Sequence, residues 1–189
     1  MYADIHLSKA GFQETDEPRL KAVLSSAKFQ DISDPQKGNS LPSSSAAFFA
    51  EGSRHFLLNE FDKAIGPYQE ALEREKKTPT LDASKWRVLV DNLAMSYGIT
   101  GNLTAADEVV KYGLSKDPTY PMFYFILADG AAERGDLDNT MKYLRQALKF
   151  RANVIPGEKL PDPMTDDSFK AFWKNDEFKK LAVAFLASP

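Results

Sequence analysis

Apolar side chains recur every three or four positions along most of the chain, from about residue 46 to residue 151. This spacing places them on one face of an α-helix and leaves the other face polar. One such series comprises Trp86, Leu89, Val90, Leu93 and Tyr97. Short turns interrupt the pattern at intervals, so the sequence predicts a succession of amphipathic helices and a mainly α-helical fold.

The turns themselves repeat along the chain. Residues 101–103 read Gly-Asn-Leu and residues 135–137 read Gly-Asp-Leu, at an interval of 34 residues. An earlier turn, at residues 59–61, lies 42 residues before the first of these, and the additional residues fall between Glu73 and Leu81. We therefore expect three helix pairs, with an extended second helix in the first pair. Small residues at Gly52, Ala94 and Ala128 would let neighbouring helices approach closely.

A helix-turn-helix unit of 34 residues with small and large apolar positions in this order resembles the tetratricopeptide repeat family. The resemblance covers about residues 45–152 and implies a TPR-like solenoid of about three repeats. In that family the first helices of the repeats line a concave groove that receives a peptide or a partner helix. Transferred helix by helix, the groove residues are Phe49, Ser53, Phe56, Asp91, Asn92, Met95, Phe125, Asp129 and Glu133.

The composition of this expected groove indicates its ligand. One branch of the family holds a C-terminal carboxylate with lysine, arginine and asparagine side chains, and only Asn92 fits that arrangement here. Phe49, Met122 and Ile126 stand at its basic positions, which argues against an acidic tail as the ligand. Apolar and acidic side chains line the groove instead, so it suits an apolar or basic segment of a partner protein. The chain's own N-terminal part is the alternative occupant.

The C-terminal part, residues 153–189, is expected to be a connector followed by capping helices. Prolines mark the connector, and Asp166 or Asp167 and then Asn175 or Asp176 can start two short helices. Helical solenoids need such a cover over the apolar face of the last repeat. Aromatic side chains would provide it here, namely Phe169, Phe172, Trp173 and Phe178.

The N-terminal part predicts a short α/β segment, a strand-helix fragment over residues 1–33, followed by a linker over residues 34–45. Polar and apolar residues alternate at residues 2–8, whereas Leu20, Val23 and Leu24 share one face of a helix. A lone strand has no partner in the sequence. Two interpretations remain open: the fragment ends an upstream domain, with Met1 as an internal start, or it forms a small lid on the first repeat.

The amino-acid composition limits the ligands and the catalytic groups that we expect in this chain. Lys and Arg number 24 and Asp and Glu number 27, so the net charge is −3, which argues against binding to nucleic acid. The chain has no cysteine and two histidines, and it contains no phosphate loop, nucleophile elbow or zinc-protease motif. One of the histidines, His55, falls at a packing position of the repeat. We therefore expect no catalytic residue, no metal and no cofactor, and a non-enzymatic protein.

The sequence contains no run of about 18 apolar residues and no signal peptide. This predicts a cytoplasmic location without a membrane span, or an exported one if the chain is a fragment of a longer protein. The expected function is protein–protein interaction, through an apolar or basic segment bound in the concave groove. The alternative is a structural or oligomerisation platform attached to a missing N-terminal domain. In that case the chain fills its own groove and forms a homo-oligomer.

Overall fold

The computed structural model describes residues 44–186 of the chain. The expected strand-helix fragment, residues 1–33, and nearly all of the expected linker lie outside the described residues. Between residues 44 and 186 the structure contains helices, turns and connecting segments but no strand. The mainly α-helical fold class is confirmed, and the division of the chain into a fragment, a linker, repeats and a cap at residues 33, 45 and 152 stays a prediction.

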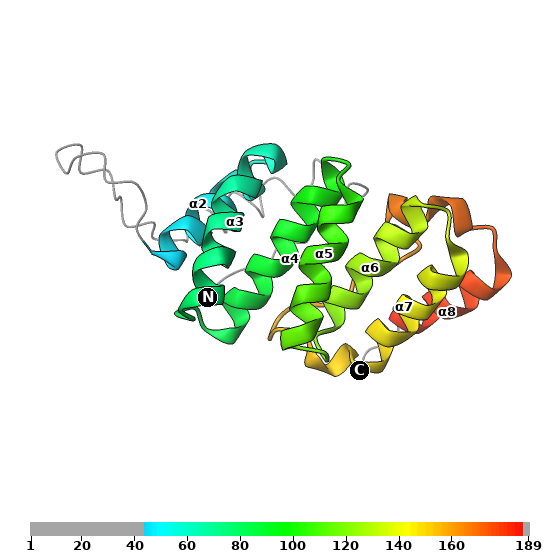
Figure 1. Cartoon of the computed structure of the whole chain (residues 1–189). Coiled ribbons are helices and arrows are strands. Elements are labelled where there is room, and N and C mark those ends of the chain that lie inside the picture. Colours follow the sequence, from blue (N-terminus) through cyan, green and yellow to red (C-terminus); the bar gives the residue numbers. More distant parts are fainter. Residues whose placement is uncertain (1–43, 187–189) are drawn as a thin grey trace, which may run out of the picture.

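Three successive helix pairs make up most of the described chain. The pairs are α2 (Ser45–Leu57) with α3 (Phe61–Lys77), α4 (Ala83–Ile99) with α5 (Leu103–Lys116), and α6 (Pro121–Glu133) with α7 (Leu137–Lys149). Each pair packs on the next, because α3 contacts α4 and α5 contacts α6. Figure 1 shows the helices arranged in a row from α2 to α8. This is the repeat architecture that the spacing of the turns predicts.

The three turns within the pairs share one backbone geometry. A residue with positive φ occupies each turn, namely Asn59 at 57°, Gly101 at 89° and Gly135 at 74°. In all three turns the N–H group of the next residue donates to the carbonyl oxygen five positions earlier, over 2.8–2.9 Å. This hydrogen bond closes a helix end whose last carbonyls have no intrahelical partner. The turn residues therefore recur in the sequence because each turn needs a residue with positive φ and forms the same hydrogen bond.

Side-chain caps start several of these helices. Asn102 and Asp136 follow the turn glycines and accept hydrogen bonds from the N–H groups three residues later, over 3.1 and 3.0 Å. Ser44 caps α2 and Asp82 caps α4 in the same way, over 3.2 and 2.9 Å. Such bonds satisfy N–H groups that the first helical turn leaves unpaired. Helix starts and helix ends are thus both encoded locally.

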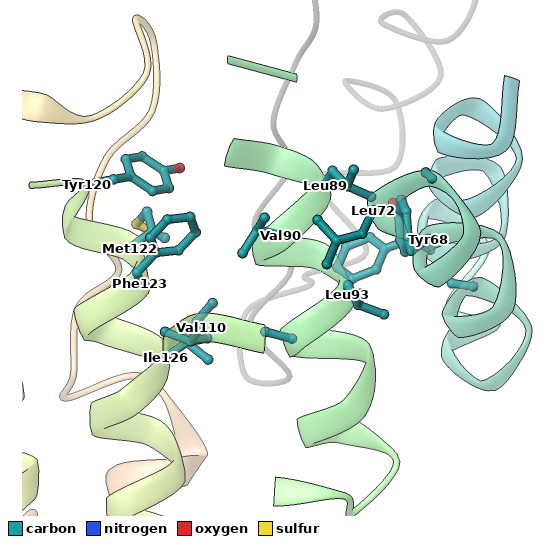
Figure 2. Close-up of a cluster of buried hydrophobic side chains, with 14 of the residues drawn as sticks. Tyr68, Leu72, Leu89, Val90, Leu93, Val110, Tyr120, Met122, Phe123 and Ile126 are labelled. Atoms are coloured by element: carbon teal, nitrogen blue, oxygen red, sulfur yellow. The ribbon is translucent and has the colours of Figure 1, made fainter. Parts of the chain in front are cut away.

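Glycines set the distance between certain helices. A Cβ atom added at Gly52 would lie 2.5 Å from the ring of Tyr68, and one at Gly113 would lie 2.8 Å from the ring of Phe123. Both rings are fully buried, and Figure 2 shows them within the hydrophobic cluster, whose buried residues come from α2 to α6. The large rings fill the space that the glycines leave, as close packing requires.

The first pair differs from the others in the length of its second helix. Helix α3 has 17 residues, whereas α5 has 14 and α7 has 13, so the extra residues after Glu73 extend the helix as expected. Near its end, Glu75 is 4% exposed and accepts three hydrogen bonds from Thr80 and one from Leu81, over 2.7–3.1 Å. These bonds fasten the loop between α3 and α4.

The C-terminal segment covers the last helix pair and confirms the expected cap. It contains the 3-10 helices η2 (Arg151–Asn153) and η3 (Asp167–Phe172) and the helix α8 (Asp176–Leu186). Phe169 and Phe178 are fully buried, and the ring of Phe169 lies 5.5 Å from that of Phe125 on α6. Asp166 starts η3 and Asn175 starts α8 by accepting backbone N–H groups, each over 3.0 Å.

The connector between η2 and η3 is anchored in the core by a buried carboxylate. Both oxygens of Glu158 accept hydrogen bonds from the Tyr120 hydroxyl, over 2.8 and 2.9 Å, and one also accepts the N–H of Ile155 over 3.0 Å. Tyr120 is fully buried beside Phe123. Of the helices between residues 44 and 186, none combines the length and the apolar character that crossing a membrane requires.

Candidate functional site

The first helices of the three pairs, α2, α4 and α6, are neighbours, and we call the surface that they form the α2–α4–α6 face. Helix α4 contacts both α2 and α6, and Figure 1 shows the three helices in that order. All nine residues expected to line a groove lie on these helices, three on each. The nine residues chosen from the repeat pattern therefore lie on three neighbouring helices.

The three aromatic candidates lie in the core. Phe49 and Phe56 are each 8% exposed, and their ring centroids lie 6.2 and 6.4 Å from that of Tyr68. Phe125 is 2% exposed and packs edge-to-face on Phe169 of the cap. These side chains therefore hold the helices of the face together and offer little surface to a partner.

Two polar candidates take part in a hydrogen-bond chain between helices. The Nδ2 atom of Asn92 on α4 donates to the hydroxyl of Tyr68 on α3, over 3.0 Å. That hydroxyl donates to Oγ of Ser53 on α2, over 3.2 Å. Asn92 is buried, so its amide is committed to fixing α2, α3 and α4 relative to one another.

Asp129 on α6 differs from these side chains. The residue is half-buried, and its Oδ1 atom is buried with no hydrogen-bond partner in the described part of the chain. Burial raises the pKa of its carboxyl group well above the ordinary value, and the nearby carboxylates of Asp166, Asp91 and Glu133 raise it further. The ionised form of Asp129 is therefore disfavoured in this structure. A cation beside the carboxylate would offset the cost of its burial and the repulsion from its neighbours.

Asp166 belongs to the same group of carboxylates, although the repeat pattern does not assign it to the face. The sequence offers Asp166 or Asp167 as a helix cap, and Asp166 reaches the face because η3 packs against α6. Burial raises the pKa of Asp166 even though Ser168 donates a hydrogen bond to it. We refer to these four residues as the carboxylate cluster: Asp91, Asp129, Glu133 and Asp166.

Basic side chains close to the carboxylate cluster in sequence are engaged elsewhere. Arg134, which follows Glu133, pairs with Asp107 of α5 over 3.2 Å. Between residues 44 and 186, no ion pair includes Asp129, Glu133 or Asp166. Glu133 is exposed, so the cluster extends from a buried oxygen to the surface. The remaining candidate, Met95, is half-buried on α4 and packs at the edge of the core.

The geometry of the carboxylate cluster favours an organic cation over a metal ion. Within the described residues, no group of three or more His, Cys, Asp and Glu side chains is placed to hold a metal. Lysine and arginine side chains make fewer geometric demands, because their N–H groups donate to separate carboxylate oxygens. The arrangement can therefore accept a basic side chain from a ligand.

A hollow outside the α2–α4–α6 face was not assigned by the sequence pattern. It has a volume of about 480 Å³, and its walls come from the end of α3, the start of α4 and the end of α5. Trp86, Tyr112 and Lys116 contribute to its lining, and Arg87 is held there by Asp117 over 2.6 Å. It contains none of the nine candidates, so the two surfaces are separate.

Comparison with solved structures supports the helical-repeat fold. The Sgt2 TPR domain from Aspergillus fumigatus matches with a TM-score of 0.51 and 18% identity, over 80% of this chain and 91% of that one. PcrH from Pseudomonas aeruginosa matches with a TM-score of 0.50 and 20% identity, over 76% of this chain and 92% of that one. No family model and no curated protein matches the sequence. At these identities the likeness establishes the fold, and it confirms the resemblance of the repeats to the TPR.

Proposed function

We propose that the chain is a non-enzymatic protein-interaction module whose α2–α4–α6 face binds a peptide segment that carries lysine or arginine among apolar residues. The observation that carries this proposal is the buried Oδ1 atom of Asp129, which lacks a hydrogen-bond partner between residues 44 and 186. A buried acceptor without a donor is costly to the folded state. A ligand that supplies the donor would therefore gain free energy at this position.

The neighbouring carboxylates favour a cationic donor over a neutral one. Asp166, Asp91 and Glu133 all act on Asp129 in the same direction and disfavour its negative charge. A lysine or arginine side chain would offset that repulsion, whereas an acidic ligand would add to it. The carboxylate cluster would thus favour basic partners and disfavour acidic ones.

The fold supports an interaction role by analogy, because the first helices of tetratricopeptide repeats form the partner-binding groove of that family. Helices α2, α4 and α6 are the first helices of the three pairs in this chain, and α4 contacts the other two. The buried candidates on these helices would act by holding the face in shape. Asp129, Glu133 and Met95 would contact the ligand.

A peptide library displayed on phage, panned against the full chain, tests this proposal. We expect the enriched peptides to share a lysine or arginine next to apolar residues. Isothermal titration calorimetry should then show that Asp129→Asn weakens their binding by at least about tenfold, because it removes one charge of a partly buried pair. The matched control is Asp138→Asn, which alters an exposed carboxylate on α7. An acidic consensus, or equal binding by the two variants, would refute the proposal.

A second candidate function, an oligomerisation platform, is favoured by exposed apolar side chains at the two ends of the row. Leu57 and Leu58 at the end of α2 are 48% and 59% exposed, and Val183 and Leu186 on α8 are 64% and 66% exposed. Contacts between copies through these side chains would bury them. Light scattering should then give an oligomeric mass that falls when Val183 and Leu186 are both changed to Lys. A monomeric mass for the parent chain would exclude this function.

A further inference from the structure

The chain itself contains a segment whose composition fits the carboxylate cluster. Residues 18–30, with the sequence PRLKAVLSSAKFQ, include Arg19, Lys21 and Lys28 and no Asp or Glu. Glu17 and Asp31 border this run, and no other stretch of residues 1–43 is as long without an acidic residue. We call residues 18–30 the basic segment. It combines basic and apolar residues, which is the ligand chemistry proposed above.

We propose that the basic segment occupies the α2–α4–α6 face of its own chain as an internal ligand, with one of its basic side chains at the carboxylate cluster. A partner of the same chemistry would then compete with the segment for the face. This inference rests on the proposed function, since it uses the same face and the same carboxylates.

Charge complementarity selects this occupant. Asp129, Glu133 and Asp166 form no ion pair within residues 44–186, and the basic segment carries three positive charges. Opposite charges attract more strongly where one of them is withdrawn from water, as at the buried oxygen of Asp129. The flanking parts of the chain, residues 1–17 and 31–43, fit less well, because each contains more acidic than basic residues.

The basic segment also offers apolar contacts. Leu20, Val23 and Leu24 are spaced three and four residues apart, so they form one apolar stripe in a helical conformation. Met95 of α4, one helical turn after Asp91, is half-buried and leaves apolar surface for such a stripe. The ligand and the face therefore match in two kinds of interaction.

The length of chain between the segment and α2 permits this arrangement. An extended chain spans about 3.3 Å per residue, so residues 31–43 reach about 40 Å from Ser44. Packed helices lie about 10 Å apart, so two steps of roughly 20 Å in total lead from α2 through α4 to α6. A tether of this length holds its ligand at a roughly millimolar effective concentration. An external partner must compete with that concentration.

A photo-crosslinking amino acid at position 24 of the full chain, Leu24→p-benzoylphenylalanine, tests the placement. Mass spectrometry should identify crosslinked peptides from α4 and α6. Crosslinking should fall several-fold when Arg19, Lys21 and Lys28 are all changed to Glu, because charge reversal replaces attraction with repulsion. The matched control reverses the same number of charges on the exposed side of α7, at Lys142, Arg145 and Lys149.

Three results of the crosslinking experiment would overturn the inference. They are crosslinks confined to α3, α5 or α7, an absence of crosslinks to residues 44–186, and crosslinks between chains in a mixture of isotopically light and heavy protein. The last result would place the segment of one copy on the face of another. Crosslinks within one chain that need the basic side chains support the inference.

A binding measurement separates this inference from the proposed function. The probe is a fluorescein-labelled synthetic peptide of residues 18–30, titrated with the parent chain and with the variant in which Arg19, Lys21 and Lys28 are Glu. We expect the variant to bind about tenfold more tightly, because its internal competitor is weakened. If the probe binds neither protein while library peptides still depend on Asp129, the inference fails and the proposed function stands. If internal crosslinks form and no external peptide binds, the inference stands and the proposed function fails.

Discussion

Two buried carboxylates in different parts of the molecule show how hydrogen-bond donors decide the effect of a buried charge. Glu75 at the end of α3 accepts hydrogen bonds from Thr80 and Leu81, whereas the Oδ1 atom of Asp129 on α6 has no partner in the described chain. Burial opposes ionisation at both residues. The donors outweigh burial and lower the pKa of Glu75, while the pKa of Asp129 rises. The first carboxylate fixes a loop, and we propose that the second interacts with a ligand.

Glu158 extends the comparison, because it resembles Glu75 in having its donors within the fold. Tyr120 and Ile155 donate to its carboxylate, and the connector is held in place as a result. The two carboxylates that stabilise loops, those of Glu75 and Glu158, thus accept several hydrogen bonds, whereas Oδ1 of Asp129 accepts none within residues 44–186. A buried carboxylate whose hydrogen-bond donors all come from the fold has a structural role, whereas one that lacks donors is a candidate for ligand binding.

Removing the carboxylate of Glu75 should have the largest effect on stability. The substitution Glu75→Ala leaves the N–H groups of Thr80 and Leu81 without their acceptor. We expect the free energy of unfolding to fall by roughly 3 kcal/mol, as for the loss of hydrogen bonds to a buried charge. Urea unfolding followed by circular dichroism measures this, with Glu70→Ala on the exposed side of α3 as the control. A loss no larger than that of the control would contradict the role given to Glu75.

The substitution Asp129→Asn should have the opposite effect on stability from Glu75→Ala. It removes a negative charge that burial and three carboxylates disfavour, and its amide can donate hydrogen bonds to them. We expect the free energy of unfolding at pH 7 to rise by roughly 1 kcal/mol, while binding of a basic peptide weakens. Asp138→Asn, measured by the same urea titration, should leave both quantities unchanged. A destabilised Asp129→Asn variant would show that the ionised carboxylate is satisfied after all.

The contributions of Glu75 and Asp129 to stability should depend on pH in opposite ways. The folded-state pKa of Asp129 lies above its ordinary value of 3.8, so the free-energy penalty of its ionisation decreases as the pH falls below the folded-state pKa and is lost below 3.8. The gain from Asp129→Asn should therefore vanish near pH 3. The pKa of Glu75 is lowered from 4.5, so its contribution is present above that value and is lost as the pH falls below it. Urea midpoints of parent and variants between pH 3 and pH 8 measure both trends.

Glu60, a carboxylate at the surface, should give the smallest effect. Hydrogen bonds from Lys63 and then from His55, over 2.7 and 2.6 Å, lower its pKa to about 2. Surface ion pairs contribute little to stability, so we expect Glu60→Gln to be indistinguishable from Asp138→Asn in urea unfolding. Nuclear magnetic resonance should still show the low pKa of Glu60, and Lys63→Met should raise it. His55, which the sequence is expected to place at a packing position of the repeat, is half-buried and contacts Glu60 through Nδ1.

Local patterns were sufficient to predict the fold. Gly101 and Gly135 recur at a fixed interval because each ends a helix with the same hydrogen bond. Asp136 and Asp166 start helices through their own side chains, and Asp166 is one of the two caps that the sequence offers for its helix. These interactions join residues close in sequence, and they are therefore visible without knowledge of the tertiary structure.

The candidate site could be predicted only in part, because it depends on which helices cover a given position. The repeat pattern assigns Phe49, Phe56 and Phe125 to the correct helices, but packing against α3 and the cap buries all three. Their contact with a ligand stays a prediction. The approach of Asp166 to Asp129 arises from the docking of η3 on α6, and no spacing in the sequence encodes it.

The common geometry of the three turns has a consequence for how such a chain can change in evolution or design. Because equivalent corners join the helices of each pair, one pair can be duplicated or lost without a new kind of junction. Each such event would lengthen or shorten the proposed binding surface by one helix, while the cap would keep its place against the last pair. Under the proposed function, the length of the bound segment and the position of its positive charge are therefore two properties that can vary independently.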